Sequence, residues 1–318
     1  MTGEGVDPSP ATSPGTGVLY IGALGRSGST LLNLLLTTVP GFFAVGELRY
    51  LWDRGLMENQ LCGCGNPFRD CEMWREVGEV AFGGWDAVDG AAMVALDRKI
   101  NRNRRVLSIT RGRLRDSQLS RLNEYREVLR SLYLAIQEVS GCTVIVDSSK
   151  TPAFAAILAG IDGLDLRIVH LIRDPRGVAY SRTKRVVRPE VVGAEAQMGR
   201  FAPVRTGALW LYFNGLFEWL RRRGTAMTRL RYEDLADEAD GELDKLLGSL
   251  PWQASARIPL GELTANHTVS GNPMRFERGA LRITRDDAWR RELPLRHRIA
   301  VSLVTAPLLG RYGYGFRR

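Results

Sequence analysis

The segment from Gly22 to Thr30 carries the strongest chemical signal in the sequence. Its glycines let backbone N–H groups approach a ligand closely, and the apolar helix that follows offers its positive N-terminal end to an anion. Arg26 can bind two oxygens at once, and Ser29 and Thr30 add hydroxyl donors. A nucleotide P-loop reads GxxxxGK[ST], but Ser29 stands where the lysine is expected. The pattern predicts an anion site, with a purely structural glycine turn as the alternative.

Two further groups of polar side chains follow predicted strands, where ligands bind in open α/β sheets. Arg173 ends one strand, and Ser181 lies eight residues later on the next helix, so the pair can hold another anionic group. Asp147 ends the preceding strand, in the place of the carboxylate that holds Mg²⁺ in P-loop NTPases. This supports a rival hypothesis, a P-loop kinase or NTPase that uses Gly22–Thr30 and Asp147. Helix capping is the alternative role for Asp147 and Asp174.

Apolar segments alternate with helical patterns along the chain and would position these residues. Strands are predicted at Val18–Gly22, Phe42–Val45, Thr143–Asp147, Leu166–Ile172 and Thr228–Tyr232. Helices are predicted at Leu31–Leu36, Pro152–Ala159, Pro175–Lys184 and Trp210–Arg223, with Cys62–Trp74 as a loop. The alternation predicts an α/β fold, a central parallel sheet flanked by helices, in a single domain from residue 18 to 318.

The ends and the composition of the chain exclude several classes of protein. With 318 residues, 44% apolar content and four cysteines, the chain is no collagen, coiled coil or disulfide scaffold. Met1–Gly17 is rich in Gly, Pro, Ser and Thr, which predicts a disordered tail and no secretory signal. No run approaches 18 apolar residues, so we expect no integral membrane segment, a cytoplasmic location and reduced cysteines.

The formal net charge of +9 is concentrated in one stretch. Arg98–Arg130 holds eleven Lys and Arg against three acids, a net charge of +8. This window is a solvated helical face, an electrostatic funnel for an anionic ligand, or the surface of a nucleic-acid binder. Tyr125 is its single aromatic residue, so it lacks a stacking ladder for bases. We therefore expect no nucleic-acid partner.

Four motifs, in order, resemble those of sulfotransferases that use 3′-phosphoadenosine-5′-phosphosulfate (PAPS), of the bacterial small-molecule or carbohydrate type. Gly25-Arg26-Ser27-Gly28-Ser29-Thr30 resembles their 5′-phosphosulfate loop, with likeness to tyrosylprotein sulfotransferases. Arg173–Ser181 is similar to their 3′-phosphate motif. Arg231–Leu235 looks like their YEDL segment, and His267–Phe276 resembles a motif near the C-terminus. The matches run from Val18 to about Trp289.

The resemblance implies a donor, a product and an acceptor class. PAPS would donate a sulfuryl group to a hydroxyl of a small molecule, glycan or lipid, leaving adenosine 3′,5′-bisphosphate, and no metal is expected. Arg173 and Ser181 would bind the 3′-phosphate. Ser270, Asn272 and Arg275 would complete the 3′-phosphate and adenosine pocket. Trp289 would pack near the adenine or belong to the core.

The resemblance also implies catalytic roles. Arg26, the loop N–H groups and Lys150 would meet the charge that develops on the leaving 5′-phosphate. Glu47, in Gly46-Glu47-Leu48-Arg49, matches the place of the catalytic carboxylate in tyrosylprotein sulfotransferases and is our preferred general base. His267 is the second candidate, although the Lys-x-His of cytosolic relatives is absent. His170 lies mid-strand and is expected to be a core histidine.

Cys62, Cys64 and Cys71 place three thiols within ten residues. Structural zinc sites take four ligands, and no fourth Cys or His is near in sequence, since Cys142 follows much later. The spacing leaves a metal site and a disulfide open. We expect ordinary packing in a loop on the acceptor side, with no metal.

Overall fold

The structure is a computed structural model that describes residues 15–191, 196–252, 262–263, 265–281 and 283–315. Its centre is a five-stranded sheet in the order β2-β3-β1-β4-β5, in which every neighbouring pair is parallel. The strands are β1 (Thr16–Gly22), β2 (Phe42–Gly46), β3 (Val144–Lys150), β4 (Leu164–Ile172) and β5 (Met227–Arg231). The prediction of a parallel α/β sheet is confirmed.

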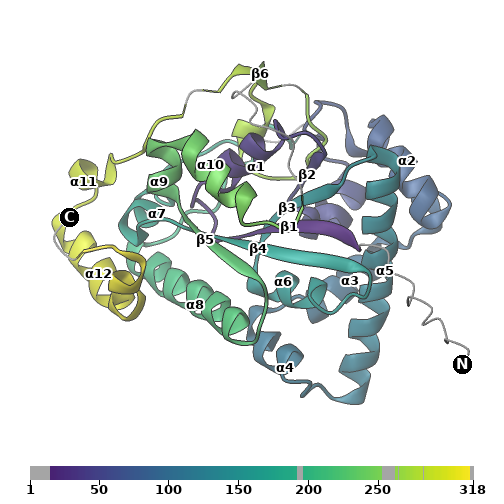
Figure 1. Ribbon diagram of the computed structural model, residues 1–318, viewed down its shortest axis with the longest axis horizontal. Coiled ribbons are helices and arrows are strands. Elements are labelled where there is room, and N and C mark those ends of the chain that lie inside the picture. Colours follow the sequence, from purple (N-terminus) through teal and green to yellow (C-terminus); the bar gives the residue numbers. More distant parts are fainter. Residues whose placement is uncertain (1–14, 192–195, 253–261, 264, 282, 316–318) are drawn as a thin grey trace, which may run out of the picture.

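Helices cover both faces of this sheet, with α1 and α10 on one side and α6 and α8 on the other (Figure 1). The α-helices are α1 (Ser29–Leu36), α2 (Glu72–Phe82), α3 (Gly90–Ile100), α4 (Val106–Thr110), α5 (Asp116–Ser140), α6 (Pro152–Leu158), α7 (Pro175–Ser181), α8 (Pro203–Arg222), α9 (Tyr232–Asp237), α10 (Ala239–Gly248), α11 (Trp289–Glu292) and α12 (Leu295–Leu309). A small antiparallel pair, β6 (Glu262–Leu263) and β7 (Gly279–Ala280), lies apart from the sheet. Within the described residues, no helix has the length and apolar character needed to cross a membrane.

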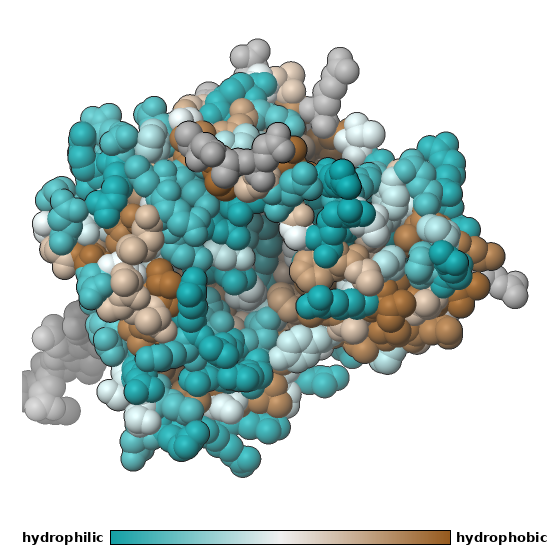
Figure 2. Space-filling model, turned by 180° about the vertical axis from the view of Figure 1, so that it is seen from behind, coloured by the Kyte–Doolittle hydropathy of each residue, from teal (hydrophilic) through white to brown (hydrophobic). Residues whose placement is uncertain are grey.

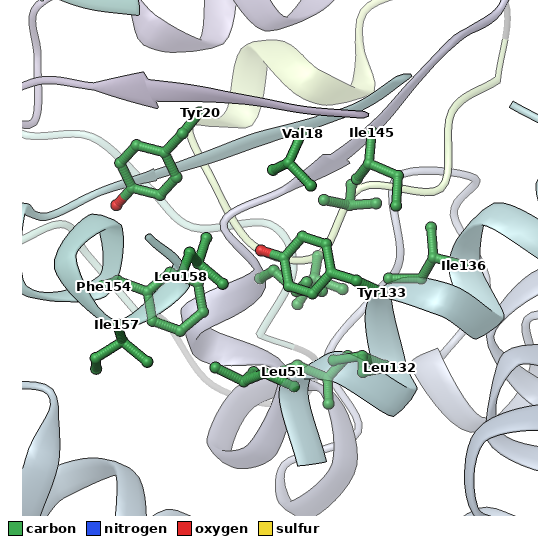
Figure 3. Close-up of a cluster of buried hydrophobic side chains, with 14 of the residues drawn as sticks. Val18, Tyr20, Leu51, Leu132, Tyr133, Ile136, Ile145, Phe154, Ile157 and Leu158 are labelled. Carbon is green, nitrogen blue, oxygen red and sulfur yellow. The ribbon is translucent and has the colours of Figure 1, made fainter. Parts of the chain in front are cut away.

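The alternation of side chains along β1 divides the core into two layers. Val18 and Tyr20 pack in the cluster that includes α5 and α6, whereas Leu19 and Ile21 pack in the cluster that includes α1 and α10. Figure 3 shows Val18 and Tyr20 on the same side of the sheet as the ring of Phe154 from α6. Because both faces of β1 are buried, the strand is apolar at consecutive positions.

Several element boundaries differ from those predicted. β1 begins at Thr16, inside the predicted tail, whose first fourteen residues lie outside the described ranges. α7 ends at Ser181, three residues before the predicted end. α8 starts at Pro203 and not at Trp210, because proline fits the first position of a helix. β3 continues to Lys150, so Asp147 lies inside the strand.

A late segment of the chain extends the sheet at β2. Val269 forms a parallel bridge with Gly46, and the two backbone N–H···O distances across it are both 2.8 Å. One of these bonds joins the N–H of Glu47 to the carbonyl of Val269. The segment around Val269 is therefore attached to the end of β2 that carries Glu47.

The C-terminal helix α12 packs against α8 and carries apolar side chains on its outer face. Leu295, Ile299 and Leu303 recur every four residues and are exposed. Figure 2 shows a hydrophobic area, in brown, on the side of the molecule where α12 lies. α12 therefore presents apolar residues to solvent as well as to the core.

Phe154→Ala tests the core on the α6 side of the sheet. The ring is fully buried, with its centroid 6.4 Å from that of Tyr20, so its loss leaves a cavity. We expect the free energy of unfolding to fall by about 3–5 kcal/mol in urea denaturation. The control Leu119→Ala removes an exposed side chain on α5 and should change the free energy of unfolding by less than about 0.5 kcal/mol. Equal losses in the two variants would contradict this core.

Candidate active site

A cavity of about 580 Å³ opens where β1, β3 and β4 end. Parallel strands bring their carboxyl ends to one edge, and the loops that follow them share this space. Most of the predicted site residues line it: Gly25, Arg26, Gly28, Ser29, Thr30, Glu47, Lys150, Arg173, Ser181 and Asn272. The structure thus brings together residues from five separate parts of the chain.

The glycine loop has a backbone that requires glycine at one position. Gly28 caps α1 with φ of 92°, and a Cβ atom there would lie 2.4 Å from the ring of Tyr232. Arg26 is also left-handed, with φ of 78°, a conformation that L-residues with side chains adopt rarely. These two residues turn the chain sharply into α1. As a result, the first turn of α1, with Ser29 and Thr30, faces the cavity.

Hydrogen bonds connect the glycine loop to the strand end of β4. Arg26 donates from Nε to Oγ of Ser181 over 3.0 Å, and Arg173 donates from Nη1 to the carbonyl of Arg26 over 3.1 Å. The guanidinium of Arg173 also lies 4.4 Å from the centre of the Tyr232 ring. Two of the sequence motifs are therefore in direct contact, and their cations lie on the same cavity.

Positive charge dominates the cavity. Among the described residues that line it, seven are cationic and two carry carboxylates: Arg26, Arg49, Arg54, Lys150, Arg173, Arg182 and Arg188 against Glu47 and Asp286. Burial, with the nearby charges of Arg26 and Arg205, lowers the pKa of Arg182 to about 10. Burial and then the charge of Arg173 lower the pKa of Arg26. The cations of the cavity repel one another, and a bound anion would reduce this repulsion. The cavity therefore favours anionic ligands.

Glu47 and Lys150 form an ion pair at the cavity wall. Lys150 Nζ lies 2.5 Å from Glu47 Oε1, and the two side chains are 13% and 11% exposed. Each follows or ends a strand, Glu47 after β2 and Lys150 at the end of β3 with φ of 70°. Residues with side chains rarely adopt such a backbone conformation, and here it occurs at the residue whose ammonium group meets Glu47. A carboxylate and an ammonium group thus lie within proton-transfer distance of each other beside the anion site.

Sequence reasoning missed several residues of the cavity. Arg49 and Arg54 follow β2, and their guanidinium groups lie 4.3 and 3.7 Å from the centre of the Tyr50 ring. Their position after a predicted strand was the available signal. Asp286 accepts a hydrogen bond from Arg173 Nη2 over 3.1 Å. Burial alone would raise the pKa of Asp286. The positive charges of Arg173 and Lys184 outweigh this effect and hold the pKa below its ordinary value.

Four predicted site residues do not line the cavity: Ser27, His267, Ser270 and Arg275. Arg275 is 1% exposed and donates to the backbone carbonyls of Thr268 and Leu61, over 2.5 and 2.7 Å. Ser270 accepts from Arg54 over 2.6 Å. His267 lies with Nδ1 3.2 Å from the sulfur of Cys71. The partners of Arg275 and His267 place these two side chains in a layer behind the cavity wall, and Ser270 reaches the cavity only through Arg54.

Asp147 does not face the cavity. It is fully buried and accepts hydrogen bonds from the hydroxyl of Tyr133 and from the N–H of Ser149. Burial raises its pKa to about 6. The carboxylate thus lies in the core on the α5 side of β3. It therefore no longer supports the hypothesis of a magnesium-dependent P-loop kinase or NTPase. Asp174 caps α7 by accepting from the N–H of Arg176, as the alternative reading predicted.

Three other sequence features also lie away from the cavity. His170 is fully buried, with Nε2 2.7 Å from Oδ1 of Asn214, and burial lowers its pKa to about 4, so the prediction of a core histidine is confirmed. Trp289 is 3% exposed and packs beneath the guanidinium of Arg176. No residue of the Arg98–Arg130 window is among the described residues that line the cavity.

Comparisons with known proteins bear on the fold. No protein-family profile matches this sequence, and no curated protein is significantly similar to it. The sulfotransferase domain from the curacin biosynthetic pathway superimposes with a TM-score of 0.54 at 18% identity, covering 95% of this chain and 99% of that domain. The sulfotransferase domain from the Synechococcus PCC 7002 olefin synthase gives a TM-score of 0.50 at 18% identity, covering 98% and 99%. The chain therefore has the fold of these sulfotransferase domains.

Proposed function

We propose that this protein is a sulfotransferase that moves a sulfuryl group from PAPS to a hydroxyl of a small-molecule, glycan or lipid acceptor. The observation that carries the proposal is the cation-rich cavity, in which Arg26, Ser181 and Arg173 are joined by hydrogen bonds and Glu47 pairs with Lys150. The shared fold of two sulfotransferase domains supports it.

The residues present fit a donor with phosphates at both ends. The loop Gly25–Thr30 would hold the 5′-phosphosulfate through its N–H groups, its hydroxyls and Arg26. Arg173 and Ser181 would hold the 3′-phosphate, with Arg173 exchanging its bond to Asp286 for one to the ligand. Asn272 also lines the cavity and would be available to the donor. When bound, PAPS supplies an activated sulfuryl group.

Glu47 is the general base in this proposal. It lines the cavity, whereas His267 does not. Glu47 takes the proton of the acceptor hydroxyl, and Lys150, 2.5 Å away, balances the carboxylate charge and meets negative charge that develops on the leaving phosphate side. Ser270 and Arg275, which were expected to touch the cofactor, act as positioning residues behind the wall.

Binding of the product tests the donor. Adenosine 3′,5′-bisphosphate at 100 times its Kd should stabilise the protein by about 2.7 kcal/mol, a rise in Tm of roughly 4–8 °C without added metal. ATP with Mg²⁺ should raise the Tm less. Thermal-shift measurements with both nucleotides check this.

Arginine variants show whether the rise comes from this cavity. Arg173→Ala should abolish the rise, because it removes a cation from the ligand site. The control Arg113→Ala changes an exposed residue of the basic window and should leave the rise in Tm unchanged. A metal-dependent response to ATP alone would contradict the proposed donor.

Glu47→Gln tests the base. With an acceptor found by screening hydroxylated compounds against labelled PAPS, we expect kcat to fall by about 10²–10⁴-fold, because the amide cannot take the proton. Affinity for adenosine 3′,5′-bisphosphate should be retained, since Glu47 makes no contact with the donor in this proposal. The matched control Glu124→Gln, exposed on α5, should leave kcat unchanged. Full turnover in Glu47→Gln would assign the base elsewhere.

A further inference from the structure

Three thiols from one short loop meet one imidazole from a distant part of the chain. The ligand atoms of Cys62, Cys64, Cys71 and His267 all lie within 4.8 Å of one another. His267 follows Cys71 by 196 residues, which is why the cysteine spacing alone showed no fourth ligand. We propose that these four side chains bind one Zn²⁺ ion in a closed structural site.

The sulfurs of Cys64 and Cys71 are as far apart as in a tetrahedral zinc site, and the distance from Cys71 Sγ to His267 Nδ1 is about 0.4 Å shorter than in such a site. Zn–S bonds of about 2.3 Å and a Zn–N bond of about 2.0–2.1 Å place two sulfurs about 3.8 Å apart and a sulfur and a nitrogen about 3.6 Å apart. The sulfurs of Cys64 and Cys71 are 3.8 Å apart, and Cys71 Sγ lies 3.2 Å from His267 Nδ1. A disulfide needs about 2.05 Å, and all the cysteines are free thiols. The spacing of these side chains therefore suits ligands that share one metal ion better than a disulfide.

The ligand types favour zinc and a structural role. Three thiolates and one imidazole select soft or borderline ions and exclude Mg²⁺ and Ca²⁺, which prefer oxygen. Cys62 and Cys71 are buried, and Cys64 and His267 are half-buried. Four protein ligands fill the tetrahedron of Zn²⁺ and leave no open position for water or substrate. The site therefore stabilises structure and takes no part in the chemistry.

The loop that carries the cysteines is shaped for this cluster. Leu61 and Pro67 form an antiparallel bridge that closes the turn around Cys62 and Cys64. A Cβ atom on Gly63 would lie 2.0 Å from Oδ1 of Asn266, so only glycine fits at this point. The N–H of Gly63 donates to the carbonyl of Thr268 over 3.0 Å. The turn is thus pressed directly against the segment that presents His267.

Two arginines offset the charge of the proposed site. Zn²⁺ with three thiolates carries a net charge of −1. Arg275 donates to the carbonyl of Leu61 over 2.7 Å, and Arg278 donates to that of Gly63 over 2.5 Å, on the same loop. Burying Arg275 at 1% exposure requires nearby negative charge, and its Nε has no hydrogen-bond partner among the described residues. The buried carboxylates of Glu190 and Glu47 act on Arg275, and a negatively charged metal centre would add to them.

The proposed site would secure the wall that carries Glu47. Val269, two residues after His267, bonds to the N–H of Glu47 across the bridge to β2. Zinc would therefore tie the cysteine loop to the segment that holds Glu47 in place. The proposed metal site does not depend on the proposed sulfuryl transfer, and each can be tested without the other.

Metal analysis of the purified full-length protein tests the site. Inductively coupled plasma mass spectrometry should find about one zinc per chain, and X-ray absorption should show three sulfurs at about 2.3 Å and one nitrogen at about 2.0–2.1 Å. Co²⁺ in place of zinc should give the visible absorption of a tetrahedral thiolate site. Removal of the metal by a chelator should lower the Tm, and added Zn²⁺ should restore it.

Variants locate the ion. Cys64→Ser and His267→Asn should each lose most of the bound zinc, whereas Cys142→Ser, which removes a buried thiol elsewhere, should keep it. If a variant fails to fold, the cobalt spectrum and chelator response of the unaltered protein decide the matter. A folded, fully reduced protein that binds neither Zn²⁺ nor Co²⁺, a disulfide among the three cysteines, or zinc retained in both ligand variants would overturn the proposal. Binding of adenosine 3′,5′-bisphosphate, measured alongside, reports on the proposed function separately.

Discussion

The parallel pairing of β1 with both β3 and β4 is the constraint on which the candidate site depends. It aligns Gly22 with Lys150 on one side and with His170 on the other. The glycine loop, Lys150 and Arg173 therefore leave the sheet from neighbouring positions at one edge. An antiparallel partner at either place would carry these loops to opposite ends of the sheet, and no shared cavity would form.

Bringing so many cations to one edge is electrostatically unfavourable, and the fold offsets it locally. Asp286 bonds to Arg173, and Glu47 pairs with Lys150. The guanidinium groups of Arg26 and Arg182 keep lowered pKa values because burial and their cationic neighbours disfavour their charge. A ligand with several anionic oxygens would supply the missing partners. The excess of positive charge that is unfavourable in the free protein thus provides affinity for such a ligand.

The layer behind the cavity wall determines how firmly Glu47 is held. Its N–H bonds to Val269, and that segment is anchored on one side by Arg275 and on the other by the cluster around His267. Arg275 and His267 therefore influence the site through the backbone that they support. In the proposed function they need no contact with the donor, since their contribution is to keep the carboxylate beside Lys150.

The sequence by itself determined the sheet, the glycine loop and the position of Arg173 and Ser181 beside one cavity, because each depends on local patterns. Consecutive apolar residues mark strands buried on both faces, and Gly28 has the left-handed backbone that favours glycine at the start of α1. Only the tertiary structure decided that Asp147 turns into the core, that Arg275 lies behind the wall and that His267 joins the cysteines. The direction of a side chain at a strand end depends on which distant segment packs there. A spacing of 196 residues between Cys71 and His267 carries no local signal of their contact.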